Sequence, residues 1–161
     1  LLIGLCGGLI VAVIIGKNEE DIKLVPALAF FMPLIAAMAG NVGVQSSAIV
    51  VQSLASHRKP ENMSKKLIKE LSVGLFNGLI LSVVMYGAGL LLGYDQLITL
   101  TVSISLLTVI VFASLFGTFI PLMLNRFKID AALATGPFIT TANDVIGLII
   151  YFQIGRLIIG Y

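Results

Sequence analysis

The sequence predicts an all-α integral membrane protein, a helix bundle of five transmembrane helices in one domain spanning residues 1–161. Of its 161 residues, 58% are hydrophobic and only 11% are charged, whereas a soluble domain carries about 25% charged residues. The hydrophobic residues form long continuous runs and do not alternate with polar ones, which excludes membrane strands. Helices are expected because the backbone of a segment in lipid must satisfy its own hydrogen bonds.

Five apolar runs give the expected spans, at about 1–16, 25–56, 67–93, 97–125 and 131–160. The last four are longer than the ~20 residues that cross a bilayer, so we expect tilted, broken or extended helices. Because Leu1 already lies within an apolar run, we expect the natural chain to begin further upstream. Glycines four residues apart predict close helix contacts at three places, Gly4 and Gly8, Gly74 and Gly78, and Gly89 and Gly93.

The second run carries a polar face made by Asn41, Gln45 and Gln52, at positions i, i+4 and i+11 of a helix. Carboxamides are poorly solvated by lipid, so this face is expected to point toward protein or water. Gly40 and Gly43 leave room for backbone carbonyls to approach a partner or an ion. The alternatives are hydrogen bonds between helices for the amides and simple helix packing for the glycines.

The third and fourth runs are expected to complete the bundle. Asn77 in the third run is expected to make a hydrogen bond to another helix, and Pro121 is expected to kink the fourth.

The fifth run contains Asp144, the only ionisable side chain well inside a membrane-length apolar run. A carboxylate there costs about 2.5–3.5 kcal/mol on insertion scales, so it needs water, a partner or an ion. It shares one helical stripe with Thr140, Gly147 and Tyr151, and Pro137 is expected to kink the start of the helix. The alternative is a structural carboxylate bonded to Ser, Thr or Asn on a neighbouring helix.

Two polar stripes on two helices predict a water-containing path across the bilayer. Oxygen ligands without Cys or His nearby suit a hard cation such as Mg²⁺, Ca²⁺ or Mn²⁺. The alternatives are that Asn143 lies on another face and that the two threonines bond to i−4 carbonyls. Besides Asp144 as the metal ligand, the candidate pore-lining residues are Gly40, Asn41, Gly43, Gln45, Gly136, Pro137, Thr140, Thr141, Asn143 and Gly147.

Basic residues in the linkers predict the orientation of the bundle. The second linker with its helix start, residues 57–70, and the fourth, residues 125–130, carry seven Lys and Arg, against three on the opposite side. The positive-inside rule therefore places both linkers in the cytoplasm, with the N-terminus inside and the C-terminus outside. The sequence has no basic stripe with interleaved aromatic residues, so nucleic-acid binding is not predicted.

Two segments resemble the signature regions of the MgtE family of magnesium channels. They are residues 33–47, with the core Gly-Asn-x-Gly-x-Gln, and residues 136–144, with Gly-Pro-x-x-Thr-Thr-x-x-Asp. The resemblance spans nearly the whole chain. It implies a homodimer in a bacterial or archaeal plasma membrane, with a Mg²⁺ pore at the dimer interface. Asp144 would then face its symmetry mate and hold a hydrated ion. The family usually carries a cytosolic Mg²⁺-sensing region before the membrane part, and we expect none of it within these 161 residues.

Other functions are open at this point. A secondary transporter could exchange Mg²⁺ or another divalent cation against Na⁺ or H⁺, with Asp144 as the carrier. An intramembrane enzyme would need at least two cooperating groups, and one carboxylate without a membrane histidine does not supply them, so we expect no enzyme. A scaffold subunit would leave Asp144 unexplained.

Overall fold

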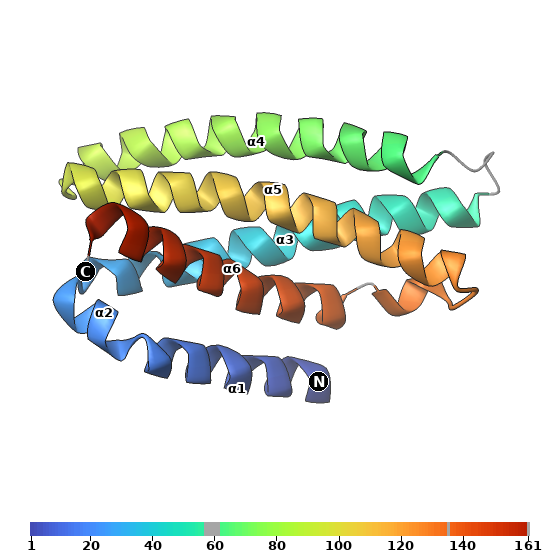
Figure 1. The fold of residues 1–161 in the computed structure, drawn as a ribbon, viewed down its shortest axis with the longest axis horizontal. Helices are drawn as coiled ribbons and strands as arrows, with labels where there is room; N and C mark the ends of the chain where they lie inside the picture. Colours follow the sequence, from blue (N-terminus) through green and yellow to red (C-terminus); the bar gives the residue numbers. More distant parts are fainter. Residues whose placement is uncertain (57–61, 135, 161) are drawn as a thin grey trace.

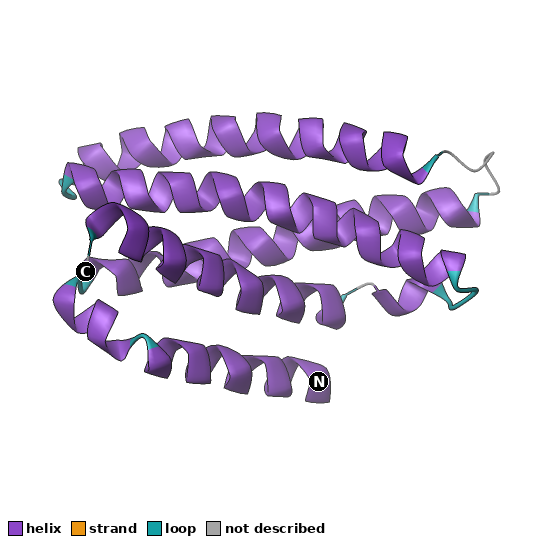
Figure 2. Cartoon of the chain, in the orientation of Figure 1, coloured by secondary structure: helices purple, strands orange, loops and turns teal. Residues whose placement is uncertain are grey.

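The computed structural model describes residues 1–56, 62–134 and 136–160, and the described part is helical throughout, with short connections (Figures 1 and 2). This confirms the all-α class. The elements in chain order are α1 (Leu2–Lys17), α2 (Glu19–Leu24), α3 (Ala27–Ala55), α4 (Met63–Leu91), α5 (Gln96–Arg126), the 3₁₀ turn η1 (Ala131–Ala134) and α6 (Pro137–Ile159).

Four of these helices, α3 to α6, are long and apolar enough to cross a membrane, and α1 is a shorter apolar helix of 16 residues. At 1.5 Å per residue α1 is about 24 Å long, less than the ~30 Å hydrocarbon layer. Among the described residues there are thus four helices of spanning length and one shorter apolar helix. The segment expected as the first polar linker contains the short helix α2, and α4 begins at Met63, four residues earlier than expected.

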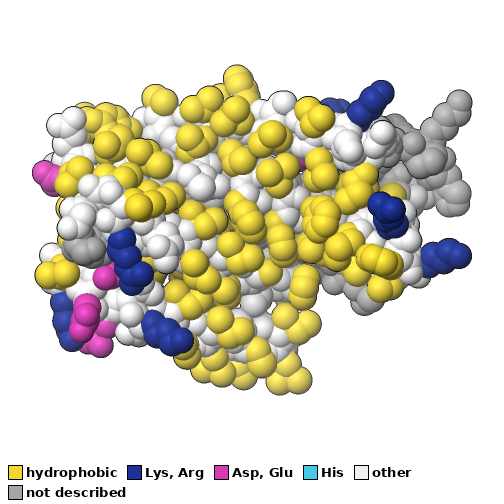
Figure 3. All heavy atoms as spheres, viewed as in Figure 1, with side chains coloured by type: hydrophobic (Ala, Val, Ile, Leu, Met, Phe, Trp, Pro, Cys, Tyr) yellow, Lys and Arg dark blue, Asp and Glu magenta, His cyan; other side chains and the backbone are white. Residues whose placement is uncertain are grey.

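Helix α5 is the centre of the bundle and packs against α3, α4 and α6. Its buried residues, among them Val102, Val109 and Ile110, join those of α3 and α6 in one hydrophobic core. Helix α4 lies along α5 on one side of the molecule, and α1 lies along α6 on the other (Figure 1). On the face shown in Figure 3, hydrophobic side chains cover the middle and charged ones gather near the two ends, as expected for a membrane protein.

Glycines bring α4 close to α5, as expected. A Cβ on Gly78 would lie 2.8 Å from a methyl carbon of Leu107, and one on Gly89 would lie 2.6 Å from the methyl of Thr99. Gly74 is likewise buried against Ser114. Gly93 does not take part, because it lies beyond the end of α4 with a φ of 82°. Asn77, contrary to expectation, is exposed on α4 and bonds to no other helix in the described part of the chain.

Pro137 was expected to kink the start of a fifth helix running over residues 131–160, but α6 begins at Pro137 itself, so that expectation is wrong. Pro137 occupies the first turn, where the missing N–H breaks no helical hydrogen bond. Gly136 precedes it with a φ of 66°, a conformation that favours glycine. The expected fifth run is thus divided into η1 and α6, and the divide lies next to the polar part of α6.

Helices α3 and α5 approach each other closely at Gly43 and Gly117. A Cβ on Gly117 would collide with the carbonyl oxygen of Gly43 and lie 3.0 Å from its Cα. Because the neighbour is backbone, relief would require the two helices to move apart.

We therefore predict that Gly117→Ala lowers the free energy of unfolding in detergent micelles by about 1–3 kcal/mol, the usual cost of overpacking. The matched control is Gly87→Ala on α4, where an added Cβ would meet nothing within 4 Å. It should leave stability unchanged or raise it by about 1 kcal/mol, because alanine favours helix. Equal stability of the two variants in an SDS titration would contradict the close approach.

Candidate functional site

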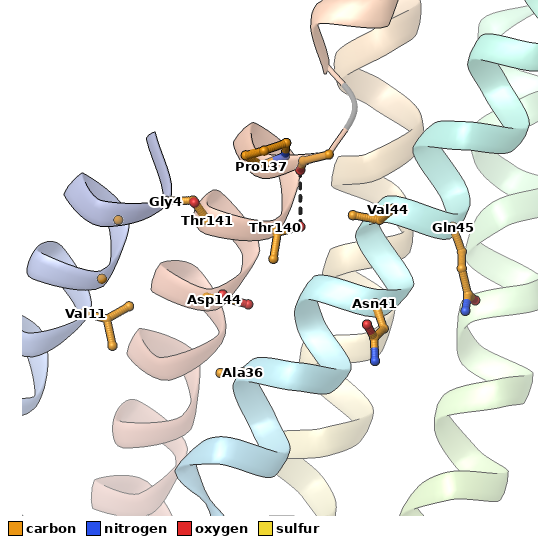
Figure 4. Close-up of a pocket in the computed structure, with 13 residues that line it drawn as sticks. Gly4, Val11, Ala36, Asn41, Val44, Gln45, Pro137, Thr140, Thr141 and Asp144 are labelled. Atoms are coloured by element: carbon orange, nitrogen blue, oxygen red, sulfur yellow. Dashed lines mark hydrogen bonds between the residues drawn. The ribbon is translucent and has the colours of Figure 1, made fainter. Parts of the chain in front are cut away.

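Asp144 lies in a hollow between α1, α3 and α6, with a volume of about 790 Å³ (Figure 4). The residues that line it come from three helices and from the cap of α6. They are Gly4, Gly7, Gly8 and Val11 of α1, Ala36, Asn41, Val44 and Gln45 of α3, and Gly136, Pro137, Thr140, Thr141 and Asp144. Seven of these are residues predicted from the sequence as metal ligand or pore lining.

The Asp144 side chain points from α6 toward α3 (Figure 4) and is half-buried. It lies against Gly40, where a Cβ would be 2.9 Å from its Oδ1 atom. The carboxylate makes no hydrogen bond or ion pair with any described residue. The alternative, a structural carboxylate that bonds to Ser, Thr or Asn on a neighbouring helix, is therefore not observed among the described residues.

Helix α3 supplies the amide groups of the hollow. Asn41 and Gln45 are one turn apart, and both are exposed and line it. Neither makes a hydrogen bond to another helix in the described part of the chain. Gln52, predicted on the same face, does not join them and lines a separate hollow between α3 and α4.

The first turns of α6 supply hydroxyl groups. Thr140 Oγ1 donates a hydrogen bond of 3.2 Å to the carbonyl oxygen of Gly136 (Figure 4), which is the i−4 bonding left open by the sequence. Its oxygen retains lone pairs that can accept a hydrogen bond from water or from a hydrated ion. Thr141 instead faces α1 and is in contact with Gly7.

The remaining predicted pore-lining residues lie in helix contacts and outside this hollow. Gly43 packs on Asn143, and Gly147 packs on Ala39 and Val109. Asn143 is 1% exposed, and neither atom of its carboxamide has a hydrogen-bond partner in the described structure. Successive helical residues are about 100° apart, so Asn143, next to Asp144, faces Gly43 of α3 and not the hollow.

Helix α1 forms one wall of the hollow with Gly4, Gly7, Gly8 and Val11, here called the α1 wall, and the sequence did not predict it. The spacing of Gly4 and Gly8 predicted close helix packing, but no atom of another element lies within 4 Å of a Cβ built at either position. The close contact is made by Gly7. Because Gly4 and Gly8 have no side chains, the space beside Thr141 and Asp144 stays open. The small-residue pattern was a usable signal, but it does not say which face meets a neighbour.

The hollow holds one carboxylate per chain. No group of three or more His, Cys, Asp or Glu side chains that could enclose a metal occurs among the described residues. An ion beside Asp144 would therefore be coordinated by oxygen atoms of water, backbone, amides or another chain. This is the chemistry of a loosely held hard cation rather than of a tight structural metal site.

A match to a protein-family model identifies the family of this chain. A model described as the divalent cation transporter MgtE matches residues 32–154, which run from within α3 to the last turns of α6 and include Asp144. The chain belongs to the MgtE family of divalent cation transporters. This confirms the resemblance seen in the sequence and the expectation that the protein is not an enzyme.

Three curated relatives are called magnesium transporter MgtE. The chain is 38% identical to the Bacillus subtilis protein, over 94% of the chain and 34% of the relative. It is 33% identical to the Thermus thermophilus protein, over 99% and 35%. The Enterococcus faecalis protein is 30% identical, over 96% and 34%. The chain thus spans about a third of the length of these MgtE proteins.

The α1 wall of this MgtE chain is held by a polar cluster at the end of the bundle. Arg156 of α6 donates through Nε to Asp21 Oδ2 at 2.9 Å and through Nη2 to Asn18 Oδ1 at 2.7 Å. The side chain of Asp21 is only 11% exposed. Removing the guanidinium would therefore leave a largely buried carboxylate without its partner.

We predict that Arg156→Gln loosens α1 and α2, lowering the local opening free energy by about 1.5–3 kcal/mol, as for a lost hydrogen bond to a charge. The measurement is amide hydrogen exchange of residues 2–24 in detergent. The control, Lys23→Gln, removes an exposed i,i+4 pair with Glu19 and should leave exchange unchanged. Equal protection in wild type and Arg156→Gln would show that the cluster does not hold α1.

Proposed function

We propose that the protein conducts Mg²⁺ across the membrane as a homodimer, and that Asp144 of the two subunits binds the hydrated ion in a pore between them. The observation that supports this most directly is the half-buried carboxylate of Asp144 in an open hollow, without a partner among the described residues. Its location within the part of the chain that matches a divalent cation transporter family adds to the proposal.

Charge balance favours a dimer around a divalent ion. One Asp144 per chain gives a formal charge of −2 for two chains, which matches the charge of Mg²⁺. A carboxylate in a low-dielectric setting strongly attracts a cation, since Coulomb energy scales inversely with the dielectric constant. Two carboxylates rather than a closed cage also leave binding weak enough for the ion to depart, as conduction requires.

The volume of the hollow favours a hydrated ion. Mg²⁺ loses its water reluctantly and usually keeps several water ligands. A volume of about 790 Å³ leaves room for an ion with its first water shell. Asn41, Gln45 and Thr140 place amide and hydroxyl oxygens around that space, where they can accept hydrogen bonds from the coordinated water.

We predict that Asp144→Asn, which removes the charge at nearly constant volume, lowers Mg²⁺ flux into proteoliposomes by about tenfold or more. A lost interaction of only ~1.4 kcal/mol already costs a factor of ten. The matched control is Glu20→Gln, which removes an exposed carboxylate on α2 and should leave the flux unchanged. Wild-type flux in Asp144→Asn would refute the pore site.

The same preparation separates a channel from an exchanger. A channel passes Mg²⁺ under voltage and concentration alone, whereas an exchanger also needs a gradient of its coupled ion. Flux that persists when Na⁺ and pH are equal on both sides supports the channel. Flux that requires either gradient replaces it with exchange against Na⁺ or H⁺.

A further prediction concerns the hydration of the ion. Cobalt(III) hexaammine is an inert mimic of hydrated Mg²⁺, so it should block Mg²⁺ flux, and Asp144→Asn should weaken the block. The measurement is the concentration for half-block in each protein. Failure of the complex to block the wild type would favour direct coordination of a dehydrated ion.

A further inference from the structure

A second polar hollow, of about 440 Å³, lies between the end of α3 and the start of α4. It is separate from the one that contains Asp144 and shares no lining residue with it. The residues that line it are Ile49, Gln52, Ser53, Ser56, Lys66, Lys69 and Glu70. Two ammonium groups, an amide and two hydroxyls thus converge on one space.

The hollow lies at the depth of lipid headgroups. From Leu71 to Leu92, which covers the rest of α4 and one residue beyond it, there is no charged residue. At about 1.5 Å per residue this stretch is about 33 Å long, close to the ~30 Å thickness of the hydrocarbon layer. Lys66 and Lys69 lie within the five residues before it, so their ammonium groups lie at the boundary between the hydrocarbon and the headgroups.

The two lysines are available to a ligand. Neither Lys66 nor Lys69 has a salt-bridge partner within the described ranges. Among the described lining residues the one carboxylate, Glu70, accepts a 3.4 Å hydrogen bond from the hydroxyl of Ser46 on α3. Within this described lining, cationic groups outnumber the carboxylate by two to one, which favours an anion over a cation.

An apolar surface continues from this hollow along α4. The helix face that carries Lys69 goes on with Val73, Phe76 and Ile80, at i+4, i+7 and i+11. Their side chains are 45%, 66% and 47% exposed. Ile49 of α3, 57% exposed, forms the apolar part of the hollow itself. A ligand with a phosphate at one end and hydrocarbon at the other matches both surfaces.

We propose that this hollow binds the phosphate headgroup of an anionic phospholipid, with Lys66 and Lys69 contacting the phosphate and the acyl chains lying along α4. Gln52 and Ser53 supply further hydrogen-bond donors to the phosphate oxygens. Basic pockets between membrane helices at the headgroup level are suited to such lipids.

The charge distribution of the bundle supports this location. The described residues at this end, where α3 and α5 finish and α4 begins (Figure 1), include five Lys or Arg and two carboxylates. The opposite end has three Lys or Arg and four carboxylates. By the positive-inside rule the lysine-rich end faces the cytoplasm, where anionic lipids and juxtamembrane basic residues attract each other.

The test is native mass spectrometry of the purified chain released from detergent, with added phosphatidylglycerol or phosphatidylcholine of identical acyl chains. Wild type should bind one phosphatidylglycerol roughly tenfold more tightly than phosphatidylcholine. Lys66→Gln with Lys69→Gln should abolish this preference, and Lys66→Arg with Lys69→Arg should retain it. Raising the salt concentration should weaken the preference, because the interaction is electrostatic.

The matched control is Arg126→Gln with Lys128→Gln, which removes the same charge at the same end of the bundle but outside the hollow. It should keep the preference for phosphatidylglycerol. The proposal is overturned if the lysine variant keeps its preference or if the control loses as much. A third arm adds inorganic phosphate alone. Binding of phosphate at this hollow without any preference among the lipids would assign it to a soluble anion instead.

Discussion

The unpaired carboxylate of Asp144 constrains the rest of the structure. A negative charge within a membrane bundle is costly unless water, an ion or an opposite charge compensates it. Here no described side chain does so, and the carboxylate instead faces an open hollow. The fold must therefore keep that hollow accessible while still packing the helices on either side of it. The arrangement of small residues around Asp144 follows from these two demands.

Glycine meets both demands in different ways. On α3, Gly40 lets the backbone approach the carboxylate, and Gly43 lets α5 and Asn143 pack closely behind it. On α1, Gly4 and Gly8 meet nothing and so widen the hollow. Glycine thus allows close packing on the α3 side of the site and leaves open space on its α1 side. In a bilayer this matters because helices gain little from hydrophobic contact with one another and depend on close packing.

The basic residues at the two ends of the bundle differ in their partners. At one end the Arg156 cluster ties α2 to α6 and so holds α1 in place as a wall of the hollow. At the other end, Lys66 and Lys69 between α3 and α4 have no salt-bridge partner among the described residues. Loss of Arg156 would leave the largely buried Asp21 carboxylate unpaired, whereas an unpaired cation at headgroup depth is suited to contact with lipid.

The sequence by itself determined the membrane class and the five apolar helices, and it identified Asp144 as the candidate site, because hydropathy and the cost of a buried charge depend on local composition. It also predicted Asn41, Gln45, Thr140 and Thr141 as pore-lining residues, since helical periodicity shows which residues of one helix share a face, and all four line the hollow that contains Asp144. Only the tertiary structure decided which face meets which helix. It placed Asn143 and Gly147 in contacts, brought α1 to the hollow, and began α6 at Pro137. These outcomes depend on how helices distant in sequence pack, and periodicity within one helix does not contain that information.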